Sequence, residues 1–373
     1  MMNPNFIDAF RNQDVILAFI AKIQNLAQQL PPPLRPLNIM EVCGGHTHTL
    51  MRYGLGTLLE PALNFVHGPG CPVCVMPKLR IDQAIALACM PNSIVVTLAD
   101  LIRVPGSQAS LQQVRAQGKD VRFVYSPLQV LQIAQDNPSK KVVFIAIGFE
   151  TTTPMSASLI QQAQRCKYNN LFFHLNHVLV PPSVRAILNS KHQIHALIAP
   201  SHVSVISGAK IYAPFVQEHQ LPVVVAGFEP VDMLEGIYML LKQVLEGRTQ
   251  LEIQYSRVVS MQGNLRAQNL VGEVMQPRAF AWRGLGEIPF SGMGLRPRYA
   301  NLDAEIVFKE HLPQTARLDH KLCLCGDILK GVLKPLDCSL FGTACTPTHP
   351  IGACMVSSEG ACAAYYRYSK PMP

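Results

Sequence analysis

The feature that most constrains the fold is an alternation of short apolar runs with amphipathic stretches, from about residue 38 to about residue 250. The apolar runs predict buried strands, and the stretches between them have the spacing of helices. Strands that alternate with helices form a parallel sheet covered on both faces. The expected strands are 38–43, 64–67, 93–98, 121–125, 141–147, 170–174, 195–199 and 222–226.

The alternation is interrupted by Asp-Asn-Pro-Ser at 136–139 and then starts again. We therefore predict an α/β fold with two consecutive parallel-sheet, Rossmann-like units, the first over 38–138 and the second over 139–250. Over 251–373 proline, glycine and cysteine become frequent, and helix-length periodicity is absent until near the C-terminus, which indicates an irregular, cysteine-rich domain. Residues 1–37 have the pattern of an amphipathic helix, which we expect to pack on this third domain.

Composition excludes several classes of protein. The chain has 373 residues, 49% hydrophobic and 15% charged, so it can bury large cores and is neither a disordered protein nor a coiled coil. No apolar run approaches the ~20 residues of a membrane helix, and the N-terminus lacks the apolar core of a signal peptide. The net charge of +8 comes from scattered residues, which argues against nucleic-acid binding. We expect a cytoplasmic protein with no membrane or nucleic-acid partner.

Cysteine usage points to metal or redox chemistry. The chain has 11 cysteines, and those in its C-terminal part are bunched between Cys323 and Cys362. In a reducing compartment, thiols grouped in this way bind metals or exchange electrons more often than they form structural disulfides.

Further candidates follow from the predicted strand ends. Ligands of parallel α/β sheets bind beyond the carboxyl ends of the strands, so polar residues there converge if both sheets face one cleft. A single histidine or glutamate at such a position is as readily a helix cap or a satisfied polar group, whereas the cysteines are harder to explain in that way. The residues at these ends are Cys43, His46, His48, Cys71, Cys74, Asp100, Arg103, Glu150, His174, His177, His202 and Glu229.

Two cysteine motifs stand at predicted strand-to-helix turns. Cys43-Gly-Gly-His46-Thr-His48 has two glycines that let the backbone approach an ion, and the helix that follows favours a thiolate at Cys43. This motif predicts a metal site, with a small buried thiol as the alternative. Cys71-Pro-Val-Cys74 has the spacing of a redox dithiol or of a transient soft-metal site. Half of a zinc knuckle is disfavoured there, because no second Cys-x-x-Cys follows.

The C-terminal cysteines favour an iron–sulfur cluster. Cys325, Cys338, Cys345 and Cys362 are separated by 12, 6 and 16 residues, without the paired knuckles of a zinc site. Counting alone does not determine which four of the six C-terminal cysteines bind, because Cys323 and Cys354 lie among them.

Together these residues resemble the HypD family of nickel–iron hydrogenase maturation proteins. The similarity extends along nearly the whole chain. The stretches that carry it are Met40–His48, His67–Cys74, Arg103–Gly106, Gly148–Thr152, His202–Ser204, Val224–Pro230 and Met355–Ala364.

The resemblance implies an assembly scaffold with redox activity rather than a conventional turnover enzyme. With a small HypC-type chaperone, such a protein holds iron while cyanide and carbon monoxide are attached to build an Fe(CN)2CO group. A HypE-type protein donates the cyanide, and the hydrogenase large subunit receives the product. By resemblance, Cys43 is the iron ligand, and Cys71 with Cys74 is a redox dithiol near that iron.

The family spacing also selects a [4Fe-4S] cluster at Cys325, Cys338, Cys345 and Cys362, which leaves Cys323 and Cys354 unassigned. A cluster near a dithiol exchanges electrons with it in ferredoxin–thioredoxin reductases, which this arrangement resembles.

Three further residues are weaker candidates for the same site. His46 is placed to hydrogen-bond a ligand or Cys43, and Glu150 and Glu229 are candidates for proton handling or partner contact.

The main alternative is a stand-alone iron–sulfur protein disulfide reductase, which needs no iron at Cys43. A second alternative is a zinc- or cluster-containing protein that modifies nucleic acid.

Overall fold

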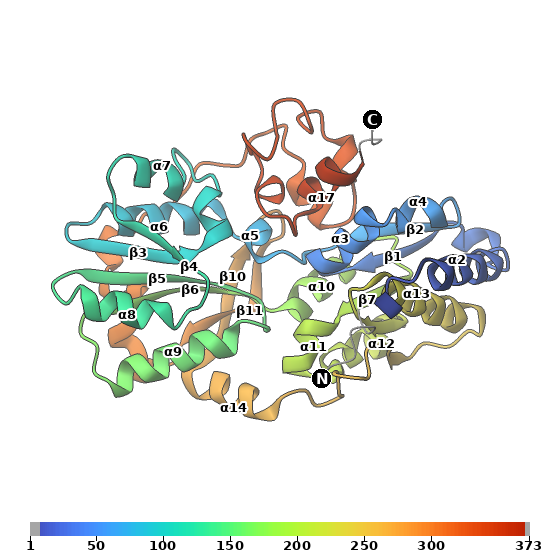
Figure 1. The fold of residues 1–373 in the computed structure, drawn as a ribbon, viewed down its shortest axis with the longest axis horizontal. Helices are drawn as coiled ribbons and strands as arrows, with labels where there is room; N and C mark the ends of the chain where they lie inside the picture. Colours follow the sequence, from blue (N-terminus) through green and yellow to red (C-terminus); the bar gives the residue numbers. More distant parts are fainter. Residues whose placement is uncertain (1–7, 370–373) are drawn as a thin grey trace.

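A computed structural model describes residues 8–369 of the chain. Figure 1 shows two α/β lobes side by side, with the C-terminal segment, coloured red, above the junction between them. Among the described residues, no helix has the length and apolar character that crossing a membrane requires.

Each lobe is built on a parallel sheet, as predicted. Sheet A has the strand order β2-β1-β7-β8-β9, and sheet B has the order β4-β3-β5-β6. All the pairings in both sheets are parallel, and most of these strands are buried along nearly their whole length. The strands are β1 (Leu37–Glu41), β2 (Leu63–His67), β3 (Ser93–Leu98), β4 (Val121–Val124), β5 (Lys141–Gly148), β6 (Leu171–His177), β7 (Ala196–Pro200), β8 (Val223–Ala226) and β9 (Leu251–Ile253).

The two sheets are not formed from consecutive halves of the chain, as the predicted boundary at residue 138 requires. The chain leaves sheet A after β2, builds sheet B with β3 to β6, and returns to sheet A for β7. Each sheet therefore draws strands from both sides of residue 138. Apolar periodicity identifies a buried strand but not its neighbours, because pairing depends on contacts between distant residues. The first crossover begins directly after β2 and carries the Cys71–Cys74 motif.

Helices cover both sheets, and several begin at the carboxyl end of a strand. They are α2 (Gln13–Ala27), α3 (Gly44–Arg52), α4 (Leu55–Leu59), α5 (Pro72–Val75), α6 (Lys78–Cys89), α7 (Leu111–Ala116), α8 (Gln129–Asp136), α9 (Thr153–Arg165), α10 (Val180–Leu188), α11 (Ser201–Ser207), α12 (Ala213–His219) and α13 (Pro230–Leu245).

The N-terminal helix does not pack where we expected it to. Helix α2 lies against α13 and α4, and Ile20 and Ile23 belong to the apolar core of sheet A. Phe19 meets Tyr238 of α13 edge-on, with 6.3 Å between ring centroids. The apolar face of α2 thus covers the outside of the sheet A lobe rather than the cysteine-rich region. Residues 1–7 of the predicted helix lie outside the described residues.

Much of the region after residue 251 is regular. Strand β9 completes sheet A, helix α14 (Leu265–Val274) packs on α9, and a hairpin of β10 (Met275–Trp282) and β11 (Gly286–Leu295) packs against β6. Helix α14 was not predicted from the sequence, and only Val274 of it is buried. The other helices of this region are short, namely α15 (Ala304–Val307), α16 (Cys325–Leu329) and α17 (Ala361–Tyr368). Its 3-10 turns include Pro335–Asp337 (η6) and Ala353–Met355 (η7), and an earlier 3-10 turn, Ala99–Arg103 (η2), follows β3.

Candidate metal and redox site

The carboxyl ends of both sheets open into one cavity. It has a volume of about 410 Å³ and is lined by residues that follow strands of both sheets, together with Ser357 and Glu359 of the cysteine-rich region. Cys43 lines this cavity and also a second one of about 360 Å³, which has Glu229 at its edge. Cys43, a partly exposed residue, therefore stands where the two cavities meet.

The turn that carries Cys43 is packed against the turn that carries Cys71. Cys43 is the N-cap of α3, and the amide N–H of Gly44 donates to the carbonyl oxygen of Gly70 at 3.2 Å. A Cβ atom on Gly70 would overlap the backbone of Cys43, so only glycine allows this approach. The two cysteine motifs, which are separated in the sequence by strand β2, are thus in backbone contact.

The electrostatics of Cys43 differ from our expectation of a favoured thiolate. Burial raises the pKa of Cys43 to about 12, and the nearby carboxylates of Glu359 and Glu41 act in the same direction. The loss of hydration outweighs the partial positive charge of the helix terminus. In the metal-free chain the thiol is therefore protonated at neutral pH, and a metal cation that binds the sulfur would reverse the balance.

Cys71 and Cys74 form a disulfide across the first turn of α5, with 5.2 Å between their Cα atoms. Both are buried, and the cavity is lined by Pro72 and Val73 rather than by the two sulfur atoms. The pair is thus close enough to alternate between dithiol and disulfide, as a redox site requires. Within residues 8–369, no group of three or more His, Cys, Asp or Glu side chains is arranged to hold a metal ion.

The His46 imidazole is buried beside the site and makes no hydrogen bond to Cys43, whereas the backbone N–H of His46 donates to the Cys43 carbonyl oxygen at 2.9 Å. Its Nε2 atom lies 3.1 Å from the carbonyl oxygen of Ala226, and its ring packs on Phe228 with 4.6 Å between centroids. The Nδ1 atom has no hydrogen-bond partner, but His46 is fully buried and lines neither of the two cavities. Burial lowers the pKa of His46, so the ring is neutral. His202 packs on the same phenyl ring, at 4.4 Å.

The two glutamates proposed for proton handling have different environments. Glu150 is buried; one carboxyl oxygen accepts the amide N–H of Val180 at 2.9 Å and the other has no partner. Burial raises the pKa of Glu150 to about 7, which suits a group that gains and loses a proton near neutrality. Glu229 instead accepts two hydrogen bonds from Arg11, at 2.6 and 2.7 Å, and both side chains line the 360 Å³ cavity.

Two other strand-end histidines belong to the packing of the sheet B lobe. His174 contacts Gln83 and Asn176 at 3.1 and 3.0 Å, and His177 contacts Ser156 at 2.8 Å. Burial lowers the pKa of both rings, that of His177 to about 4. Neither histidine lines the cavity beside Cys43, so both are neutral core residues of the sheet B lobe.

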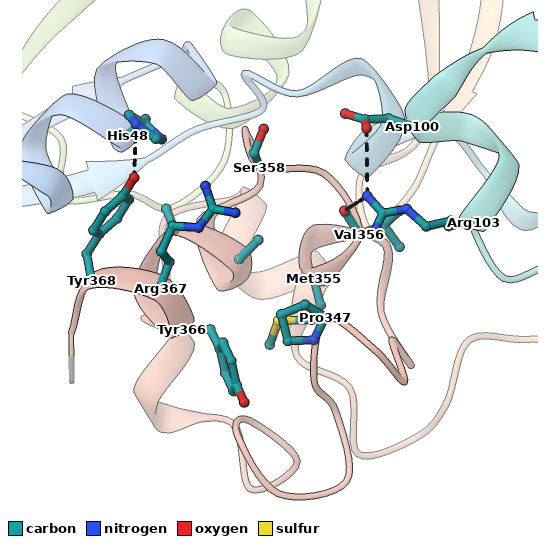
Figure 2. Close-up of a pocket in the computed structure, with 12 residues that line it drawn as sticks. His48, Asp100, Arg103, Pro347, Met355, Val356, Ser358, Tyr366, Arg367 and Tyr368 are labelled. Carbon is teal, nitrogen blue, oxygen red and sulfur yellow. Dashed lines mark hydrogen bonds and ion pairs between the residues drawn. The ribbon is translucent and has the colours of Figure 1, made fainter. Parts of the chain in front are cut away.

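His48, Asp100 and Arg103 line a third cavity, of about 590 Å³, between α3, η2 and α17. Figure 2 shows His48 beside Tyr368 on one wall and Asp100 beside Arg103 on the other. The His48 Nε2 atom is 3.2 Å from the Tyr368 hydroxyl, and the Arg103 guanidinium is 3.7 Å from the Asp100 carboxylate. Asp100 also lines the 410 Å³ cavity, so the two spaces share a wall.

Sequence analysis missed Glu41, the last residue of β1, which is fully buried. Its carboxylate accepts the amide N–H of Cys43 at 3.0 Å, the hydroxyl of Thr47, and Nδ1 of His67 at 2.6 Å. A glutamate inside an apolar strand was the available signal, because a buried carboxylate must be paired. Its partners lie on other elements, which the sequence does not reveal.

The C-terminal cysteines are only partly gathered: Cys362 interacts with Cys325, Cys354 and Cys345, whereas the hydrogen bond described for Cys338 goes to the backbone. Cys325, Cys345 and Cys362 are buried, and Cys338 is partly exposed with its thiol 3.7 Å from the carbonyl oxygen of Leu322. The amide N–H of Ile351 donates to the sulfur of Cys345 at 3.3 Å. Soft thiols on irregular backbone, with an N–H aimed at sulfur, fit the chemistry of an iron–sulfur cluster.

The two unassigned cysteines are part of the same group. The Cys325 side chain interacts with those of Cys323, Cys354 and Cys362. A Cβ on Gly352 would overlap the sulfur atoms of Cys323 and Cys325, so the backbone passes directly beside them. Cys354 is fully buried.

Comparison with known proteins agrees with the motifs. Residues 14–369 match the family described as HypD, hydrogenase formation hypA family. The chain is 48% identical to hydrogenase maturation factor HypD2 of Bradyrhizobium diazoefficiens, over 98% of this chain and 97% of the relative. It is 46% identical to HypD of Azotobacter vinelandii (98% and 97% covered) and 44% identical to HypD of Escherichia coli (97% and 98% covered). The chain therefore belongs to the HypD family of hydrogenase maturation factors.

Proposed function

We propose that the chain is an assembly scaffold that holds one iron at Cys43 while cyanide and carbon monoxide are attached to it. The observation that carries this proposal is the position of Cys43 in the wall between two cavities. One cavity leaves room for small diatomic ligands, and the other leaves room for a partner that shares the iron. We infer that this partner is a HypC-type chaperone, that a HypE-type protein donates cyanide, and that the hydrogenase large subunit receives the Fe(CN)2CO group.

The side chains around Cys43 support this role. Iron arrives as cargo, and its charge would release the proton that burial keeps on the Cys43 thiol. A single protein thiolate leaves coordination positions open for cyanide and carbon monoxide. Glu150 lies between Phe149 and Thr151, which line the 410 Å³ cavity, and it would accept or return a proton near neutral pH. His46 has an unpartnered Nδ1 atom but lines neither cavity.

The second element of the proposal is electron supply. A [4Fe-4S] cluster held by Cys325, Cys338, Cys345 and Cys362 would exchange electrons with the Cys71–Cys74 pair. Helix α5 packs against η7, and the disulfide shares one apolar core with Cys325, Cys345 and Cys362, which supports this route. Two electrons and two protons convert the disulfide to two thiols, and since the cluster would pass one electron at a time, an external one-electron donor would have to reduce it twice.

Infrared spectroscopy on the protein, purified anaerobically with its small partner, tests the proposal. We expect bands of metal-bound cyanide and carbon monoxide that disappear in Cys43→Ala. Cys166→Ala, which removes an exposed thiol, is the matched control and should keep the bands. Bands that persist in Cys43→Ala would exclude Cys43 as the iron ligand, and their absence from the wild type would exclude the scaffold role.

A stand-alone disulfide reductase is the second candidate, favoured by the disulfide itself. On that mechanism Cys43→Ala would retain reductase turnover on a protein disulfide, whereas Cys71→Ala would lose it. Absence of turnover in the cluster-loaded wild type would remove this candidate.

A further inference from the structure

The buried carboxylate of Glu41 begins a chain of contacts toward the cysteine-rich region. It binds the Cys43 turn on one side, through the amide of Cys43 and the hydroxyl of Thr47. On the other side it binds His67, the residue directly opposite it on the neighbouring strand β2. Three donors on one buried carboxylate leave it little freedom, because any movement would cost a charge-assisted hydrogen bond.

His67 continues the chain to helix α17. Since Nδ1 donates to Glu41, Nε2 faces the hydroxyl of Tyr365, at 3.1 Å. The two rings meet edge-on, with 5.4 Å between centroids, and both side chains are buried. Tyr365 lies three positions after Cys362 on the same helix, so it moves with that cysteine.

A second contact runs parallel to the first. Helix α17 packs along α3, the helix that Cys43 caps, and Tyr368 reaches His48 at 3.2 Å, as Figure 2 shows. This second pair lines an open cavity, whereas the first is enclosed in the protein. Water therefore does not compete for the hydrogen bonds that link Glu41, His67 and Tyr365.

We propose that Glu41 is a positioning residue that couples the Cys43 turn to helix α17 through His67 and Tyr365. The juxtaposition of the Cys43 amide, Glu41, His67 and Tyr365 holds the iron-binding thiol in a fixed register with the helix that carries Cys362. The inference rests on the proposed function, because it assumes that Cys43 binds iron and that Cys362 binds the cluster. Neither Glu41 nor Tyr365 contacts the iron on this proposal.

Two conservative variants test the coupling in the full-length protein. Tyr365→Phe keeps the ring and removes only the hydroxyl, and Glu41→Gln keeps the shape but gives Cys43, Thr47 and His67 a poorer acceptor. The first readout is the rate at which iodoacetamide alkylates Cys43, located by mass spectrometry. One hydrogen bond of ordinary strength corresponds to about a fivefold shift in a local equilibrium. We expect alkylation about fivefold faster in Tyr365→Phe and about tenfold faster or more in Glu41→Gln.

The second readout is spectroscopic. The cluster absorbance of Tyr365→Phe should equal that of the wild type, while its infrared bands for iron-bound diatomics broaden or shift. Tyr368→Phe, which removes a hydroxyl one turn further along α17 and leaves the Glu41 chain intact, is the control and should change the bands less. Unchanged alkylation and unchanged bands in both Glu41→Gln and Tyr365→Phe would overturn the proposal.

The outcomes separate this inference from the scaffold proposal. If the wild type shows no diatomic bands, the scaffold role fails, yet the alkylation rates still decide whether Glu41 positions Cys43. If Tyr365→Phe loses the cluster while Cys43 reacts at the wild-type rate, Tyr365 stabilises the cysteine-rich region only, and the coupling is refuted.

Discussion

Replacing Gly70 with alanine should separate the two cysteine turns on which the site depends. The new Cβ would overlap the N and Cα atoms of Cys43, which are backbone atoms and cannot rotate away. Overpacking of this kind costs about 1–3 kcal/mol. Moving the loop also breaks the hydrogen bond from Gly44 to Gly70, which is worth about 1 kcal/mol. We expect a loss of about 3 kcal/mol in the free energy of unfolding.

Guanidinium denaturation measures that loss, and infrared bands of iron-bound diatomics report on the site itself. Gly272→Ala is the matched control, because nothing lies within 4 Å of its added Cβ and it stands inside helix α14. The same change there should raise stability by about 0.5–1 kcal/mol. A Gly70→Ala protein that is as stable as the wild type and keeps its bands would refute the packing of the two turns.

Three further predictions concern a buried ion pair, a buried glutamate and the cluster. Glu305→Gln should cost about 3 kcal/mol in chemical denaturation, because it leaves the buried Arg80 without the carboxylate that it contacts at 2.7 and 2.8 Å; a loss below about 1 kcal/mol would contradict this. Burial raises the pKa of Glu150 to about 7, so the folded chain keeps a proton that the unfolded chain has already released, and this contribution to stability is lost as pH rises through that value. Glu150→Gln should therefore match the wild type near pH 5 and be more stable near pH 8, and an equal difference at both would refute the assignment. Cys325→Ser should abolish the visible absorbance and bound iron of the cluster while Cys354→Ser retains them; the reverse pattern would replace the ligand set that we propose.

The elements themselves were predictable because their signals are local. Buried strands such as Val142–Gly148 consist of consecutive apolar residues, and the burial pattern of β5 follows that run. Glycine and cysteine directly after β1 and β2 indicated functional turns at the carboxyl ends, which is where Cys43 and Cys71 stand. Helix α14 is the exception, because it was not predicted although its apolar residues have helical periodicity.

The electrostatic character of Cys43 was not predictable from its neighbours in sequence. The turn into α3 favours a thiolate locally through the backbone N–H of Gly45, but burial outweighs it and raises the pKa of the thiol, and Glu359, from the other end of the chain, acts in the same direction as burial. Glu41 was overlooked for the same reason. Only Val42 separates it from Cys43 in the sequence, but its contacts extend through His67 to Tyr365, near the other end of the chain.

The sequence by itself determined that this protein has parallel α/β units, strand-end cysteines and a cysteine-rich C-terminal part, because each depends on periodicity or spacing within a few residues. Only the tertiary structure decided which strands share a sheet, where α2 packs, that Gly70 touches Cys43, and that Cys323 and Cys354 join the other C-terminal cysteines. Those arrangements pair residues as distant as Met40 and Leu197. Their energies depend on which surfaces meet after folding, and local residue patterns carry little information about that.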